Sequence, residues 1–199
     1  PKAGNVLQER LSQWTAFASG AGAPVSNGTA EQGLVGGKAM ARLLYNCAVV
    51  IDVENIPARA VHHLIHWLRA RFNIVAAMGF ADFTQPTLLN AKAALQRLGI
   101  TLCNVPTQHA SRSYRKNMVD HTLVAETMWF HAHRGREIDV YVLVSGDGHL
   151  APMARIFHRD HKRVIVAALP QSSNAWLRQE ADQFIPLRPP AKARPRLLH

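Results

Sequence analysis

One stretch of this sequence constrains the fold more than any other. Residues 141–150 have the sequence YVLVSGDGHL, in which an unbroken run of β-prone residues enters a Ser-Gly-Asp-Gly turn and a helical pattern follows. An apolar run without alternation is typical of a strand that is buried on both faces, as in a parallel sheet. Asp147 therefore comes just after the carboxyl end of a strand, where open α/β sheets bind their ligands.

A second junction of strand and acid lies upstream. Residues 48–55 have the sequence AVVIDVEN, in which an apolar strand ends at Asp52, and Pro57 then suits the first turn of a helix. Strand and helix signals alternate along the rest of the chain, which is typical of one α/β domain. We predict five strands, at 47–53, 74–80, 100–105, 138–145 and 163–169. We predict helices at 57–72, 86–98, 118–133, 150–159 and 174–181, with Gly99 as the cap after the second.

The order of the strands decides whether the two acids meet. Crossovers between parallel strands are right-handed, and a chain that doubles back after its third strand has the strand order 3-2-1-4-5. The first and fourth strands are then neighbours at the switch point, so Asp52 and Asp147 share one pocket. We therefore predict an α/β fold with a mainly parallel, five-stranded sheet.

A third acid can reach the same edge of the sheet. Asp120 lies near the start of the helix that leads into the fourth strand. Three converging carboxylates would repel one another and raise their pKa values unless a cation shared them. Mg²⁺ and Mn²⁺ prefer oxygen ligands and are the fitting ions. Such a site suggests metal-assisted hydrolysis of a phosphodiester.

The charge of the chain favours a polyanionic partner. The 199 residues include 23 Lys and Arg against 13 Asp and Glu, a net charge of +10. A basic surface is typical of proteins that bind nucleic acid, although a merely basic, soluble protein is the alternative. No apolar run approaches the about 20 residues of a membrane span, and the N-terminus lacks the order of a signal peptide. We expect a cytoplasmic protein with Cys47 and Cys103 as reduced core thiols.

A polar, basic loop is predicted over residues 106–117. It carries Arg112, Arg115 and Lys116 just ahead of Asp120. These side chains could hold a nucleic-acid backbone through charge-assisted contacts, or they could simply be solvated.

The acidic motifs resemble the NYN domain, a family of PIN-like nucleases whose bacterial members are of the LabA/DUF88 type. The matching stretches fall within about residues 45–187 and are IDVENI, KNMVD, SGDGHL, KRVIVAA and ADQFIPL. The resemblance implies a three-layer Rossmann-like PIN/NYN fold with the strand order argued above. It also implies the metal-dependent ribonuclease activity that many members have.

The resemblance assigns roles to individual residues. It implies that Asp52, Asp120 and Asp147 bind the metal, that Asn55 orients water or phosphate, and that Ser145 belongs to the substrate-binding Ser-Gly-Asp turn. His149 departs from the pattern, because the family commonly has a second Asp there. The lost charge could weaken a second metal ion, shift the preference toward Mn²⁺ or impair the site. A neutral imidazole at His149 could still bind metal or substrate, or move a proton.

Three functions of different classes are compatible with these residues. The first is a metal-dependent ribonuclease, an endoribonuclease on single-stranded or structured RNA, with Asp52, Asn55, Asp120 and Asp147 as its catalytic residues. The second is an NYN-like RNA-binding or regulatory module that has lost turnover. The third, a phosphatase with an aspartyl nucleophile, fits less well because Glu54 stands where its acid, an Asp, is needed.

The histidines do not form a convincing zinc motif. His62 and His66 are four residues apart, and His158 and His161 three, but neither pair has nearby cysteines or the HExxH spacing. We expect solvated histidines on helix surfaces. Of the remaining acids, Asp82 could reach the rim of the pocket, and Glu126 is better explained as structural.

We predict three segments in the chain. Residues 1–44 hold a helix at 6–17 and a segment rich in Gly, Ala and Ser, residues 45–187 form the nuclease domain, and 188–199 form a basic, Pro-rich tail. The first and last segments could serve a partner protein, a homodimer or an additional RNA strand, and the sequence leaves these open.

Overall fold

The computed structural model describes residues 44–107 and 112–188, with side chains described from residue 117 onward in the second range. The predicted helix at 6–17, the Gly-rich segment that follows it and the tail from residue 189 lie outside the described residues. The division of the chain at residues 44 and 188 therefore stays a prediction.

The centre of the fold is a six-stranded sheet in the order β3-β2-β1-β4-β5-β6, and every neighbouring pair is parallel. The strands are β1 (Asn46–Asp52), β2 (Asn73–Ala81), β3 (Thr101–Asn104), β4 (Val140–Val144), β5 (Arg163–Ala168) and β6 (Gln183–Pro186). The predicted order is confirmed, and β6 adds one strand to the predicted five. This edge strand is hard to predict from the sequence, because it is only four residues long and ends in Pro186, which cannot donate a ladder hydrogen bond.

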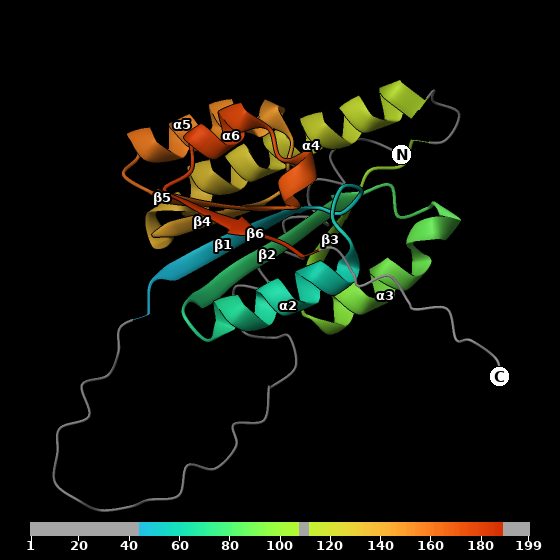
Figure 1. Ribbon diagram of the computed structural model, residues 1–199, viewed down its shortest axis with the longest axis horizontal. Coiled ribbons are helices and arrows are strands. Elements are labelled where there is room, and N and C mark those ends of the chain that lie inside the picture. Colours follow the sequence, from blue (N-terminus) through green and yellow to red (C-terminus); the bar gives the residue numbers. More distant parts are fainter. Residues whose placement is uncertain (1–43, 108–111, 189–199) are drawn as a thin grey trace, which may run out of the picture. The chain divides into compact units, whose positions relative to one another are not determined.

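Helices cover both faces of the sheet. They are α2 (Ala58–Arg69), α3 (Leu89–Arg97), α4 (Arg112–Arg134), α5 (Ala151–Arg159) and α6 (Ala175–Gln179), with short 3-10 turns η1 (Pro86–Leu88), η2 (Gly135–Glu137), η3 (Gly148–Leu150) and η4 (Pro170–Ser172). Figure 1 shows α2 and α3 on one face and α4, α5 and α6 on the other. The α/β, three-layer Rossmann-like architecture is thus confirmed. No helix in the described part of the chain is long and apolar enough to cross a membrane.

One predicted boundary is wrong. The loop expected over 106–117 does not extend to residue 117, because α4 already begins at Arg112. Positive charges oppose the helix dipole at a helix start, which favoured a loop in the sequence. Arg and Lys nevertheless have high helix propensity, and the helix continues through them into the apolar pattern that follows.

Burial explains why the central strands have no alternating pattern. The residues from Cys47 to Ile51 in β1 are fully buried, as are nearly all of those in β4. Each Val or Ile buried in this way contributes about 1.5–3 kcal/mol of apolar transfer energy. On the α2 and α3 side, Gly99 ends the helix with φ at +70°, a conformation that glycine adopts without strain, so its predicted capping role is confirmed.

The pairing of β1 with β4 positions the functional residues. Ile51 lies opposite Val144, so the next residues, Asp52 and Ser145, emerge side by side at the carboxyl edge of the sheet. This edge is the switch point, because β2 follows β1 on one side and β4 lies on the other.

Candidate active site

Asp52 is deeply buried at this edge, with 2% of its surface exposed. One of its oxygens, Oδ2, accepts two hydrogen bonds, from Nδ2 of Asn55 at 2.5 Å and from Oγ of Ser145 at 3.0 Å. Burial raises the pKa of the Asp52 carboxyl and the nearby charge of Asp147 adds to the rise, whereas the bonds from Asn55 and Ser145 oppose it. Burial therefore disfavours the charged form of Asp52, and the hydrogen bonds from Asn55 and Ser145 partly offset this cost.

The turn after β4 is organised around Asp147. Its backbone N–H donates to Oγ of Ser145 at 3.1 Å, so this one hydroxyl connects Asp147 with Asp52. The Oδ1 atom of Asp147 accepts from the backbone N–H of His149 at 3.0 Å, which caps η3. The same oxygen lies 2.8 Å from Nδ1 of the His149 ring.

Asp120, Asp147 and His149 form a group that can hold a metal ion. Each offers one ligand atom, and these atoms lie within 4.8 Å of one another. Asp120 comes from α4 and is 9% exposed, whereas the His149 side chain is 81% exposed. Two carboxylate oxygens and one imidazole nitrogen suit Mn²⁺ well, while Mg²⁺ prefers an all-oxygen set. The donors therefore fit a divalent cation.

Asp52 is not a member of this group. It reaches the group through Ser145 and through its electrostatic interaction with Asp147. The structure thus brings together Asp52, Asn55, Ser145 and Asp147 by direct bonds, and Asp120 joins them through the group that could hold a metal ion. The predicted role of Asp52 as a metal ligand stays a prediction.

One wall of the site was not expected from the sequence. A pocket of about 440 Å³ lies beside Asp147, and half of its lining comes from the segment after β5. The lining residues are Asn55, Gly146, Asp147, Gly148, Gln171, Ser172, Ser173 and Asn174. The signal was available, because a polar QSSN run follows a parallel strand and must therefore lie at the same edge of the sheet.

Comparison with known proteins decides the family. The family model of the NYN domain matches residues 46–188. This chain belongs to the NYN domain family. The predicted membership is confirmed, with nearly the predicted bounds.

A solved structure supports the fold of this NYN domain. It is a protein of unknown function from Vibrio parahaemolyticus RIMD 2210633, with 20% sequence identity and a TM-score of 0.59, and the match covers 73% of this chain and 94% of that chain. At this identity the likeness concerns the fold alone. Comparison with curated proteins gave no match.

Other predicted residues have different positions in the NYN domain. Arg112, Arg115 and Lys116 lie in the first turns of α4, and their side chains are outside the described part. Asp82 is buried and accepts hydrogen bonds from Oγ1 of both Thr84 and Thr107, at 2.5 Å each. Burial would raise the pKa of Asp82, but these bonds outweigh it and lower the pKa. Asp82 therefore connects the loop after β2 with the segment after β3 by hydrogen bonds.

The histidines on α2 fit the expected solvated surface. His62 and His66 are both exposed, with ring centroids 4.5 Å apart. Across the described residues, the one group of three or more potential metal ligands is that of Asp120, Asp147 and His149. A separate zinc site has no support in this part of the chain.

Proposed function

We propose that this NYN domain is a metal-dependent ribonuclease, an endoribonuclease that hydrolyses RNA phosphodiester bonds with Mg²⁺ or Mn²⁺. The observation that carries the proposal is the convergence of Asp120, Asp147 and His149 beside the buried Asp52. Membership of a PIN-like nuclease family and a net charge of +10 support an RNA substrate. The cytoplasmic location that we expect is part of the same proposal.

In this proposal, Asp120, Asp147 and His149 hold the divalent ion, with Asp52 as a further ligand or a neighbouring charge. The bound ion would activate a water molecule and neutralise charge on the leaving oxygen. Ser145 keeps Asp52 and Asp147 in fixed relation, because its hydroxyl bonds to both residues.

The remaining residues position the substrate. Asn55 is exposed, lines the pocket and is held by its bond to Asp52, so its amide can orient a phosphate or a water. Arg112, Arg115 and Lys116 begin the helix that carries Asp120. Their positive charges would hold the RNA backbone by attraction that weakens with salt.

Cleavage of a labelled, mixed-sequence RNA tests the proposal. The reaction is run with Mg²⁺, Mn²⁺ or EDTA, for the wild type and for Asp147→Asn. Asparagine keeps the oxygen that accepts from the His149 N–H, so the turn survives while the charge is lost. We expect cleavage to require metal and to fall more than about 100-fold in the variant, because losses of 10–100-fold already follow from removing a group that only orients a ligand.

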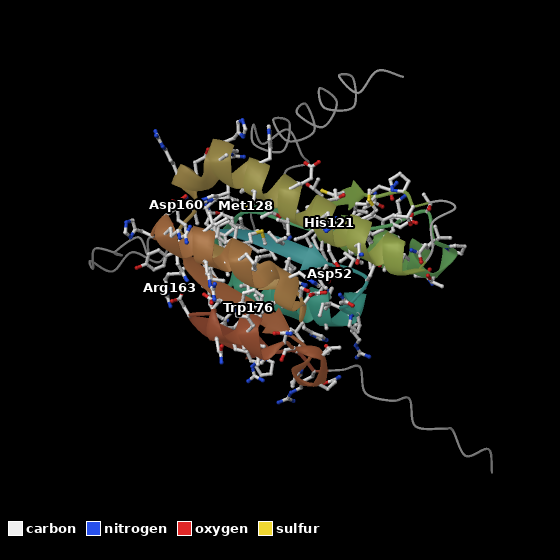
Figure 2. All side chains as sticks on the ribbon, turned by 90° about the horizontal axis from the view of Figure 1, so that it is seen from above. Asp52, His121, Met128, Asp160, Arg163 and Trp176 are labelled. Carbon is white, nitrogen blue, oxygen red and sulfur yellow. The ribbon has the colours of Figure 1, made fainter. Side chains whose placement is uncertain are left out.

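Asp160→Asn is the matched control. It removes the same charge at the far end of α5, and Figure 2 shows Asp160 and Asp52 toward opposite ends of the sheet. The control variant should cleave like the wild type, and thermal melts of both variants check that they fold. Cleavage that persists in EDTA contradicts the proposal. Salt-sensitive RNA binding without cleavage in any metal would instead identify an RNA-binding module.

A further inference from the structure

The pocket beside Asp147 has a chemistry of its own. Among the described residues that line it, Asp147 is the one with a charge, and the others offer glycine, hydroxyl and amide groups. From these described residues a phosphate would meet a carboxylate and no cation. An uncharged group that both donates and accepts hydrogen bonds is the better occupant, and nucleobases and ribose have that character.

The polar groups of the segment 171–174 are available to a ligand. Gln171 is exposed, and its side chain makes no hydrogen bond to the described residues. Ser172 and Ser173 donate only long bonds, of 3.3 and 3.2 Å, to carbonyls of their own loop. Asn174 uses Oδ1 to cap α6, which leaves its amide N–H groups to donate. These groups can be redirected to a ligand at little cost, because the bonds they would give up are weak.

The segment 171–174 is fixed to the metal-binding turn. The N–H of Asn174 donates to the carbonyl of Gly146 at 2.9 Å. A Cβ atom on Gly146 would lie 2.2 Å from the carbonyl oxygen of Ser172, and one on Gly148 would lie 2.7 Å from the Asn174 side chain. At position 146 only glycine permits this approach without a shift of the Ser172 backbone. The segment 171–174 is therefore held in a fixed position relative to Asp147.

We infer that this pocket receives the nucleobase and ribose of a nucleotide next to the scissile phosphate, and that Gln171 contributes to base preference. The inference rests on the proposed function for its substrate, RNA. Asp147 belongs to both the pocket and the candidate metal group, and Asn55 lines the pocket and bonds to Asp52, so an occupant of the pocket is a neighbour of the reacting phosphate. The volume of about 440 Å³ lies in the range of roughly 300–1,000 Å³ that small ligands occupy.

The inference also limits the form of the RNA. A base that enters the pocket exposes its hydrogen-bonding edge to Gln171 and cannot remain paired. The enzyme therefore selects unpaired nucleotides at this position, in single strands, loops or bulges.

Binding of the four ribonucleoside 5′-monophosphates in EDTA tests the pocket without cleavage. Titrations followed by NMR compare the wild type with Gln171→Ala and with the matched control Gln179→Ala, an exposed glutamine on α6 outside the pocket. We expect preference for one or two bases, shifts of the amide signals of 171–174, and a loss of affinity of about 3- to 10-fold in Gln171→Ala alone, as for one uncharged hydrogen bond. Inorganic phosphate should not compete.

Sequencing of the RNA ends produced by each protein gives the second readout. Gln171→Ala should relax the base preference at one position beside the cut, while Gln179→Ala keeps it. Cleavage with an unchanged base preference in Gln171→Ala, together with equal nucleotide binding by both variants, would refute the base-binding role of the pocket. The proposed nuclease function would still hold in that case. Base-selective binding by a protein that never cleaves RNA would support the pocket and refute the nuclease.

Discussion

Replacing Ser145 by alanine should destabilise the domain far more than a serine substitution usually does. The Ser145 hydroxyl is fully buried, donates to Oδ2 of Asp52 at 3.0 Å and accepts from the N–H of Asp147 at 3.1 Å. Ser145→Ala removes both bonds at once.

The magnitude follows from the two bonds. A hydrogen bond to a charged group contributes about 1.5–3 kcal/mol, and a neutral one about 0.5–1.5 kcal/mol. Asn55 still donates to Asp52 in the variant, so we take the lower half of the sum and expect a loss of about 2–3 kcal/mol. In a domain of this size, that loss corresponds to a fall in Tm of roughly 4–12 °C.

The loss should also depend on pH. Burial raises the folded pKa of Asp52 above its unfolded value, so this carboxyl favours the folded state most below the unfolded pKa and loses that stability as the pH rises through the folded pKa. The bond from Ser145 opposes the rise in pKa. Removing this bond raises the folded pKa of Asp52 further, so the free energy of unfolding falls more with pH in the variant than in the wild type. The difference in stability between the two proteins therefore grows with pH.

Urea denaturation of the wild type and Ser145→Ala at pH 4.5 and pH 8 would measure both effects. Ser173→Ala is the control, because its hydroxyl makes only a 3.2 Å bond to a carbonyl in an exposed loop, and it should change the free energy of unfolding by less than about 0.5 kcal/mol. A loss below about 1 kcal/mol in Ser145→Ala at both pH values would refute the bridging role.

Three further predictions concern the same domain. Gly146→Ala should lower the free energy of unfolding by about 1–3 kcal/mol in urea denaturation, because its Cβ would lie 2.2 Å from the Ser172 carbonyl oxygen and the loop must move; an unchanged midpoint would show that the loop yields freely. His149→Asp should raise the affinity for Mg²⁺ relative to Mn²⁺ in calorimetric titrations, because it gives the group an all-oxygen donor set, and an unchanged ratio would exclude His149 as a ligand. The Cys47 thiol should resist alkylation at pH 8 until the protein is denatured, since burial raises its pKa to about 12, and mass spectrometry locates the label.

The sheet and its acids could be predicted because their signals are local and strong. Unbroken apolar runs ending in an acid indicated β1 and β4, and the topology rules for parallel sheets then placed Asp52 beside Ser145. The positions of the acids at strand ends and near a helix start were enough to select them as site candidates without any knowledge of their contacts. The different roles of these acids could not be predicted from the sequence. They depend on the hydrogen bonds that Asn55 and Ser145 donate to one oxygen of Asp52.

The missed features are those that depend on contacts far apart in the sequence. The pocket wall at 171–174 is defined by its packing on Gly146 and Gly148, and each segment alone has only a turn signal. At the opposite end of the sheet, the buried His131 bonds through Nδ1 to Tyr141 and through Nε2 to Asp160, at 2.9 and 2.7 Å. Tyr141 was expected in the core, but nothing in its sequence context indicates a histidine partner.

The bond between Ser145 and Asp52 has a consequence for the timing of activity. The two residues are 93 positions apart, and they meet only when β4 has paired with β1. A ribosome synthesising this chain releases Asp52 long before it adds Asp147, and the parallel pairing that unites them is a slow, non-local step of folding. Under the proposed function, a nascent chain in which β4 has not yet paired with β1 lacks the assembled site and cannot cut RNA.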